Sequence, residues 1–225
     1  VLWKSFFASN KEILKIWRAI NQGLTLIVKN KVAIIDSIGS NMASLIFALK
    51  RIDLNVKVTS DIASIKQASH IILPGVGAAK NAMMRLRQKD LINEISNLSQ
   101  PTLGICLGMQ LFMDASSEDD TECLGIIANS CRPFENQKDY PVPHMGWNKV
   151  HFNTDSKLTK NLNDGEYYYF VHSYYVPICD ETIGVSRYPI DFSAVIERNN
   201  FYGTQFHPEK SGIPGEKILE NFVNL

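Results

Sequence analysis

Short apolar runs alternate with amphipathic segments in the first half of the chain. Apolar runs rich in β-branched residues at Lys31–Asp36, Asn55–Thr59 and His70–Leu73 predict buried strands. Between these runs, apolar residues recur at helical spacing, which predicts helices at Met42–Lys50 and Asp61–Lys66. Strands that alternate with helices are typical of a parallel sheet covered on both faces. Ligands are therefore expected at the carboxyl ends of the strands.

The next apolar run ends at a cysteine that stands between two glycines. Thr102–Ile105 leads into Cys106, with Gly104 and Gly108 on either side, and a helix-like run follows at Met109–Met113. Strand, sharp turn and helix resemble the elbow of G-x-S-x-G hydrolases, with cysteine in place of serine. The first N–H groups of the helix favour a thiolate and can hold an oxyanion. A buried structural cysteine is the alternative, but the glycine setting favours a nucleophile.

A glycine-rich turn, Pro74-Gly-Val-Gly77, follows the third predicted strand. Its glycines free the backbone to bring an N–H group close to a ligand. A plain connection between strand and helix is the alternative. Because the next strand carries Cys106, the two turns are expected to face one reacting carbonyl.

The second half of the chain changes to short strands and turns. An acidic segment, Asp114–Thr121, is expected to be a solvated loop. Strands are predicted at Leu124–Ala128, Trp147–Phe152 and Tyr167–Val171. Pro141–Trp147 is rich in Pro and Gly, so it is expected to be a structured loop, either packed or presented to a partner.

The last two predicted strands lead directly to a histidine. Ala194–Glu197 and Phe201–Phe206 are expected to form a hairpin that runs into His207-Pro-Glu209. Residues two apart in an extended chain face the same side, so Glu209 is expected to orient the imidazole of His207. A packing histidine is the alternative, but the independent cysteine elbow favours the base of a catalytic triad.

Composition narrows the class of protein. The 225 residues suit one large α/β domain, and 23 Lys and Arg balance 23 Asp and Glu, so neither nucleic acid nor an anionic membrane surface is expected as a partner. No apolar run reaches 18 residues, so no transmembrane helix is predicted.

The four cysteines argue against a metal site or a disulfide framework. They form no C-x-x-C pair and lie at no metal-ligand spacing from histidine, so no metal or cofactor is expected. Cys123, Cys131 and Cys179 are expected to pack in the protein interior. A free nucleophilic thiol fits a reducing cytoplasm.

Residues 1–30 are predicted to be an N-terminal helical extension of unknown role, and residues 31–225 the functional domain. Ser9-Asn-Lys-Glu12 is typical of a capping box, and apolar residues then recur at helical spacing. Five Lys and Arg stand against one Glu in the extension, and no small-residue cleavage site follows, so a secretory signal is not expected.

Five motifs together resemble a known family. Gly-Ile-Cys106-Leu-Gly-Met-Gln and Gln-Phe-His207-Pro-Glu209-Lys-Ser are similar to the motifs of class I (triad) glutamine amidotransferases. Pro74-Gly-Val-Gly77, Pro143-His-Met-Gly-Trp-Asn148 and Tyr169-Phe-Val-His-Ser-Tyr174 narrow the resemblance to the glutaminase subunits of imidazole glycerol phosphate synthase. The resemblance covers about residues 31–225. Ser37–Asn41 fits the family's first loop only loosely.

The resemblance implies a fold and a set of roles. The expected fold is a flavodoxin-like, three-layer α/β sandwich with a mostly parallel sheet and antiparallel additions. Cys106, His207 and Glu209 are the implied nucleophile, base and orienting carboxylate. The implied oxyanion residues are Gly75, Val76, Gly77 and Leu107. The implied glutamine contacts are Gln110, Glu118, Ser173 and Tyr174. The implied partner face comprises Pro143, His144, Met145, Gly146, Trp147, Asn148 and Lys210.

The family's partner is a (β/α)₈ synthase subunit, bound as a heterodimer. It receives ammonia and makes imidazole glycerol phosphate and an aminoimidazole carboxamide ribotide in histidine biosynthesis. Three alternatives stay open on the sequence. The same glutaminase could feed another synthase, such as one that aminates a sugar for surface polysaccharide. The chain could also be a stand-alone cysteine γ-glutamyl hydrolase, or a binding module without catalysis.

Overall fold

A computed structural model describes residues 31–36, 42–153 and 155–225. The predicted N-terminal extension, residues 1–30, and the turn at 37–41 lie outside the described residues. In the described part of the chain, no helix is both long and apolar enough to cross a membrane.

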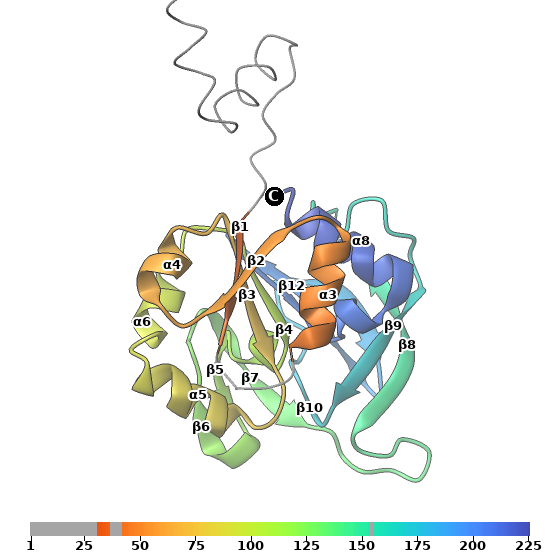
Figure 1. The fold of residues 1–225 in the computed structure, drawn as a ribbon. Coiled ribbons are helices and arrows are strands. Elements are labelled where there is room, and N and C mark those ends of the chain that lie inside the picture. Colours follow the sequence, from red (N-terminus) through yellow and green to blue (C-terminus); the bar gives the residue numbers. More distant parts are fainter. Residues whose placement is uncertain (1–30, 37–41, 154) are drawn as a thin grey trace, which may run out of the picture.

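Five strands form the parallel half of a nine-stranded sheet in the described residues, in the order β2-β1-β3-β4-β13 (Figure 1). Their bounds are β1 Lys31–Ile35, β2 Asn55–Thr59, β3 His70–Gly75, β4 Thr102–Cys106 and β13 Phe201–Thr204. The predicted strands of the first half are thus present. Strand β13, from the end of the chain, lies directly beside β4.

Helices cover both faces of this parallel half (Figure 1). On one face lie α3 (Ala43–Arg51) and α8 (Gly212–Phe222), and on the other lie α4 (Ile62–Lys66), α5 (Ala79–Gln88) and α6 (Ile92–Ser96). The sheet has one hydrophobic cluster on each face, and alternate side chains of β1 point into the two clusters. Val32 packs with α3 and α8, while Ala33 packs with α4 and α5. This arrangement confirms the three-layer sandwich.

Four strands continue the sheet in antiparallel order, as β13-β12-β11-β8-β9. Their bounds are β8 His144–Phe152, β9 Glu166–His172, β11 Thr182–Arg187 and β12 Asp191–Arg198. A smaller sheet has the order β10-β7-β5-β6. Its strands are β5 Met113–Ser116, β6 Thr121–Glu122, β7 Ile127–Pro133 and β10 Tyr174–Tyr175. The short helices are α7 Leu107–Gln110, η1 Glu118–Asp120 and η2 Pro208–Lys210.

From Cys106 onward, three predicted elements are wrong, and the strand predicted at Leu124–Ala128 begins only at Ile127. Pro141–Trp147 is not a loop throughout, because β8 begins at His144 and pairs residue by residue with β9. Asp114–Thr121 is not a plain loop, since it contains most of β5 and a 3₁₀ turn. The helix after Cys106 ends at Gln110, and Met113 already belongs to β5. In each case pairing with distant strands overrides local composition.

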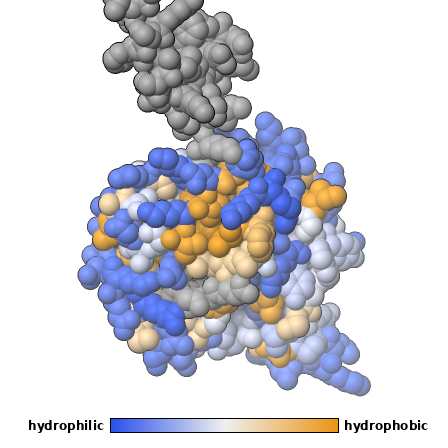
Figure 2. All heavy atoms as spheres, in the orientation of Figure 1, coloured by the Kyte–Doolittle hydropathy of each residue, from blue (hydrophilic) through white to orange (hydrophobic). Residues whose placement is uncertain are grey.

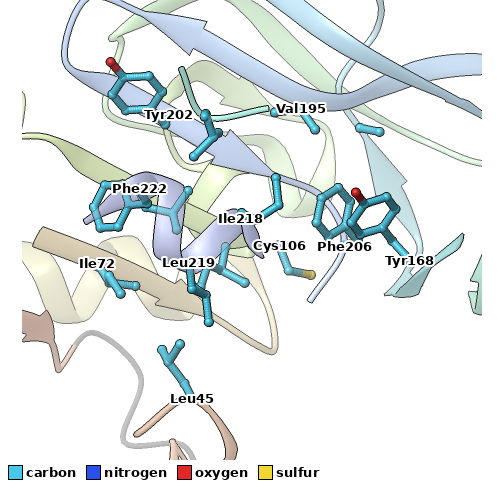
Figure 3. Packing of buried hydrophobic residues seen from close by; sticks show 14 of the residues in the cluster. Leu45, Ile72, Cys106, Tyr168, Val195, Tyr202, Phe206, Ile218, Leu219 and Phe222 are labelled. Carbon is cyan, nitrogen blue, oxygen red and sulfur yellow. The ribbon is translucent and has the colours of Figure 1, made fainter. Parts of the chain in front are cut away.

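The core on the α3 and α8 face extends into the antiparallel half. Ile218, Leu219 and Phe222 of α8 pack in one cluster with aromatic residues of β9 and of the chain after β13 (Figure 3). Tyr168 and Phe206 lie close together in this cluster, with ring centroids 4.2 Å apart, and Cys106 belongs to the same cluster (Figure 3). On the outer surface, apolar residues gather around β1, β2 and α3 (Figure 2), where Phe47 is exposed.

Candidate active site

Cys106 stands at the carboxyl end of β4 in a strained backbone conformation, with φ 54° and ψ −110°. Such values are rare for a residue with a side chain, and they persist where the surrounding structure enforces them. A Cβ on Gly108 would overlap the carbonyl oxygen of Leu73, and a Cβ on Gly104 would lie 2.7 Å from the backbone of Gly108. The two glycines therefore allow the tight turn that holds Cys106 at the end of its strand.

The helix after the cysteine is shorter than predicted. Helix α7 contains only the four residues Leu107–Gln110, so a long helix dipole does not act on the sulfur. A side chain supplies a further donor, because Nε2 of Gln205 donates to Sγ of Cys106 at 3.6 Å. The sulfur also lies 3.7 Å from the carbonyl oxygen of Val171 on β9.

His207 and Glu209 form the predicted pair. Nδ1 of His207 lies 2.8 Å from Oε1 of Glu209, and both side chains are buried. The predicted reason was incomplete: His207 is extended, but Pro208–Lys210 forms a 3₁₀ turn that brings the carboxylate back to the ring. The carboxylate of Glu209 fixes the orientation of the imidazole ring, so Nε2 of His207 is left to exchange a proton with a substrate.

The electrostatics of His207 reflect its two neighbours. Burial lowers the pKa of His207, but the nearby sulfur of Cys106 and the carboxylate of Glu209 outweigh burial and raise this pKa to about 10. Nε2 of His207 is buried and makes no hydrogen bond within the described residues. Contacts between nucleophile and base are often loose before a substrate binds, and this nitrogen is available for proton transfer.

Cys106 and His207 line one cavity of about 350 Å³. Its wall also includes residues from the glycine-rich turn, from the acidic segment and from the end of β9. The lining residues are Val76, Gly77, Leu107, Gln110, Glu118, Pro143, Val171, His172, Ser173 and Tyr174. The cavity thus brings together segments that are about 100 residues apart in the sequence.

The glycine-rich turn lies beside Cys106. Gly75 pairs with Cys106 in the register of β3 and β4. Val76 is exposed, and Gly77 adopts φ 89°, a conformation that favours glycine. Oε2 of Glu118 accepts a hydrogen bond from the N–H of Ala79 at 2.6 Å, so the acidic segment anchors the start of α5 directly after this turn.

The predicted glutamine contacts all reach the cavity wall, but Gln110 also has structural partners. Its Nε2 donates to the carbonyl of Tyr174 at 2.7 Å and to Oε1 of Gln205 at 2.9 Å. Ser173 lies between β9 and β10 and belongs to neither strand. Its carbonyl accepts from the N–H of Phe134 at 2.9 Å.

The predicted partner residues divide into exposed and buried ones. Met145 and Trp147 on β8 are 63% and 56% exposed. Nζ of Lys210 lies 5.7 Å above the ring of Tyr169 on the neighbouring β9. His144, in contrast, is only 3% exposed, so its side chain points into the protein and not outward with Met145 and Trp147.

The other cysteines differ from Cys106 in their surroundings. Cys123 and Cys131 are buried, and burial raises the pKa of Cys123 to about 11 and that of Cys131 further still. Cys179 is half-buried beside Thr182. In the part of the chain that the structure describes, no group of three His, Cys, Asp or Glu side chains could hold a metal ion.

Sequence reasoning missed three residues of the site. Val171 and His172 line the cavity, and Gln205 contacts the sulfur. Gln205 could have been found, because it stands two residues before His207 and the side chains of an extended chain alternate. His172 carries no local signal, since its position depends on how β9 pairs with β8.

The comparisons with known proteins agree on one family. The family model for glutamine amidotransferase class-I matches residues 33–225. The chain is 46% identical over 194 residues to imidazole glycerol phosphate synthase subunit HisH 2 of Legionella pneumophila, covering 86% of this chain and 98% of that protein. It is 44% identical over 196 residues to subunit HisH of Bacteroides thetaiotaomicron, covering 87% and 100%.

Solved structures share the fold at lower identity. PurLQS from Thermotoga maritima superimposes with a TM-score of 0.67 at 18% identity, covering 88% of this chain and 99% of that chain. A glutamine amidotransferase from Thermotoga maritima gives a TM-score of 0.59 at 17% identity, covering 87% and 83%. At this level of identity the likeness concerns the fold alone.

Proposed function

The chain belongs to the class I glutamine amidotransferases, and from this premise we propose that it is the glutaminase subunit of an imidazole glycerol phosphate synthase. It hydrolyses glutamine and passes the ammonia to the synthase subunit in histidine biosynthesis. The observation that carries the proposal is the cavity shared by Cys106 and His207, with Glu209 held 2.8 Å from the imidazole.

The first half of the reaction forms a thioester. The thiolate of Cys106 attacks the side-chain carbonyl carbon of glutamine, and a carbon–sulfur bond forms. The N–H of Leu107 and one N–H from the turn at Gly75–Gly77 hold the oxyanion. The carbon–nitrogen bond then breaks, and His207 gives its proton to the leaving nitrogen, so ammonia departs.

The second half restores the enzyme. His207, now neutral, takes a proton from water as the water attacks the thioester. The carbon–sulfur bond breaks and glutamate leaves. Glu209 stabilises the imidazolium in both halves, and the raised pKa of His207, about 10, supports this role.

The substrate groups of glutamine have matching partners around the cavity. We assign Gln110, Glu118, Ser173 and Tyr174 to glutamine binding, and all four line the cavity. Glu118 already holds the N–H of Ala79 at 2.6 Å. Binding of glutamine at Glu118 would therefore also stabilise the turn that supplies the oxyanion donor.

The (β/α)₈ barrel of the synthase docks on the outer face of β8 and β9. Met145, Trp147 and Tyr167 are exposed there, with Lys149 and Lys210 next to tyrosine rings. Exposed aromatic and methionine side chains are enriched at protein interfaces. Pro143, Gly146 and Asn148 belong to the same docking segment. A reactive thiol of this kind works in a reducing compartment, which supports a cytoplasmic location.

Docking has to control glutamine hydrolysis, because ammonia released without a synthase is lost. One oxyanion donor lowers the activation barrier by about 3–4 kcal/mol. A peptide that supplies this donor only after docking would change the rate by about 10²–10³-fold. The glycines on both sides of Val76 make such a peptide rotation cheap.

Glutamine hydrolysis by the purified chain tests the proposal, measured alone and together with the synthase barrel and its nucleotide substrate. We expect near-silence alone and stimulation of about 10²–10³-fold in the complex. Full activity without any partner would contradict the proposal and favour a stand-alone γ-glutamyl hydrolase. Co-purification of a sugar-aminating synthase in place of the histidine-pathway barrel would contradict the pathway.

A further inference from the structure

Two buried histidines face each other between the glutamine cavity and β8, the strand proposed to dock the synthase and called the docking strand below. His144 on β8 lies directly opposite His172 on β9 in the antiparallel register. The two side chains are 3% and 6% exposed, and Nδ1 of His144 lies 2.9 Å from Nε2 of His172. The catalytic steps above use neither histidine, although His172 lines the cavity.

The contacts of these rings fix the direction of every hydrogen bond. Nδ1 of His172 lies 2.8 Å from the carbonyl of Tyr174, so this nitrogen carries the proton and Nε2 of His172 accepts. Nδ1 of His144 must therefore donate to His172, and Nε2 of His144 accepts. The donor to that nitrogen is Nδ2 of Asn148 at 3.3 Å. The carbonyl of Arg187, 3.0 Å from the same Nδ2, fixes the amide orientation.

Burial keeps both rings neutral, which this pattern requires. Burial lowers the pKa of His144 to about 4. It also lowers the pKa of His172 to about 3, against the raising effect of the Tyr174 carbonyl. The ring of His144 is stacked on Phe170 and Tyr188, with centroids 4.9 Å and 4.0 Å away. A stacked neutral ring has little freedom to turn, so one arrangement of the hydrogen bonds is favoured.

The chain of hydrogen bonds continues to the nucleophile. The carbonyl of Tyr174 also accepts from Nε2 of Gln110, whose second hydrogen goes to Oε1 of Gln205. This contact directs the Gln205 amide nitrogen toward Sγ of Cys106, at 3.6 Å. Both glutamines are buried, and a buried amide that loses its partner leaves an unsatisfied donor or acceptor.

We propose that His144 and His172 are positioning residues in one hydrogen-bonded chain, which runs from Asn148 on β8 to the sulfur of Cys106. The chain holds the carbonyl of Tyr174 and the amide of Gln110, and through them the donor that faces the sulfur. Because it begins on the docking strand, it also transmits docking of the synthase to the nucleophile, and this second part rests on the proposed function.

Alkylation of Cys106 by iodoacetamide tests the first part without glutamine or a partner. His144→Phe keeps an aromatic ring in the stack and removes both hydrogen bonds of the imidazole. We expect the alkylation rate of Cys106, followed by peptide mass spectrometry, to change by about tenfold, the effect of one buried hydrogen bond left unmade. Thermal unfolding of the same samples shows that the variant is folded.

Two further variants separate positioning from packing. Tyr188→Phe keeps the ring stacked on His144 and removes only a hydroxyl that donates to the carbonyl of Pro141 at 2.7 Å, so its rate should equal that of the unchanged chain. His144→Asn restores a donor in the place of Nδ1 and should recover most of the original rate. Equal rates for His144→Phe and Tyr188→Phe, or no recovery with His144→Asn, would overturn the proposal.

Steady-state kinetics in the complex with the synthase test the second part. His144→Phe should lower the stimulation of kcat by the synthase by about tenfold, with a smaller change in the KM for glutamine. Unchanged stimulation would overturn the transmission of docking. If instead the unchanged chain gains no activity from the synthase, the proposed function fails, while the alkylation result still decides on the positioning role.

Discussion

The parallel and antiparallel halves of the nine-stranded sheet carry different parts of the site. In the parallel half, β3 and β4 are buried along their whole length and helices cover both faces. In the antiparallel half, exposed and buried residues alternate along β8, so one of its faces is open. Parallel sheets are usually covered on both sides, whereas antiparallel sheets can leave one side free. The proposed nucleophile, Cys106, stands on the covered half, and the proposed docking face belongs to the open half.

This division bears on how the strained backbone of Cys106 is held. A rigid, fully packed half can hold Cys106 at φ 54°, because a close-packed interior resists relaxation of the strain. The open half supplies exposed side chains and, through His172, one wall of the cavity. Substitutions in the parallel half should therefore affect chemistry and folding, and those on the open face should affect association.

The largest effect is expected for the nucleophile. Cys106→Ala should lower glutamine-dependent turnover of the complex by about 10⁴-fold or more, the order of loss seen when a triad nucleophile is removed. Turnover with added ammonium salts should stay intact, because the synthase is unchanged. Coupled assays with each nitrogen source measure both rates.

Cys179→Ala is the matched control for this prediction. Cys179 is half-buried in the antiparallel part of the molecule, so both activities should persist in this variant. An equal loss of glutamine- and ammonium-driven turnover in Cys106→Ala would contradict the division of roles between the two subunits.

The next largest effect concerns a glycine in each half. A Cβ on Gly108 would overlap the carbonyl of Leu73, so Gly108→Ala should cost about 3–5 kcal/mol of unfolding free energy. A Cβ on Gly146 in β8 meets no atom within 4 Å, although φ is 134° there. Gly146→Ala should therefore cost only about 1–2 kcal/mol. Denaturant unfolding measures both, and equal costs would contradict a more rigid parallel half.

A smaller effect is expected on the open face. Trp147→Ala removes an exposed aromatic side chain from the docking strand and should weaken binding of the synthase by about 2 kcal/mol, or about 30-fold. Met84→Ala, an exposed apolar side chain on α5 of the parallel half, should leave the affinity unchanged. Calorimetric titration measures both affinities, and a similar loss in the two variants would argue against docking on β8 and β9.

The smallest effect concerns the pH dependence of stability. The pKa of His207 is raised to about 10 in the folded protein. Histidine in the unfolded chain has a pKa of about 6.5. Protonation of His207 therefore stabilises the fold fully below about pH 6.5, and this stabilisation is lost as pH rises through about 10. Glu209→Gln removes one cause of the raised pKa, so the variant should lose the stabilisation at lower pH.

Denaturation midpoints at several pH values between 6 and 10 measure this difference. One unit of change in the pKa of His207 corresponds to about 1.4 kcal/mol. The difference in unfolding free energy between the unchanged chain and Glu209→Gln should therefore change by about this amount between pH 6 and pH 10. Parallel curves for the unchanged chain and Glu209→Gln would show that the carboxylate does not raise the pKa.

Local sequence patterns predicted the parallel half well. Strands β1, β2, β3 and β4 and helices α3 and α4 lie within one or two residues of the predicted bounds, because apolar periodicity and caps act over short distances. The close contact of His207 with Glu209 was predicted for the same reason, since only Pro208 separates them.

The antiparallel half was predicted less well, because its structure depends on distant partners. Strand β8 begins at His144 despite the nearby prolines and glycine, since every residue from His144 to Val150 pairs with β9. Helix α7 ends early because Leu111 and the residues after it bond to the chain around Leu124. The contact of Gln205 with Cys106 joins residues 99 positions apart, and only the two-residue spacing of Gln205 from His207 could have indicated it.

The position of β13 has a consequence for protein synthesis. This strand covers the edge of β4 and leads to Gln205 and His207, yet it begins at residue 201, long after β4 begins at residue 102. A chain still emerging from the ribosome thus has the thiol but lacks the imidazole, and β4 has an open edge that invites aggregation. Under the proposed catalytic roles, a chain that has not yet added β13 to the sheet releases no ammonia.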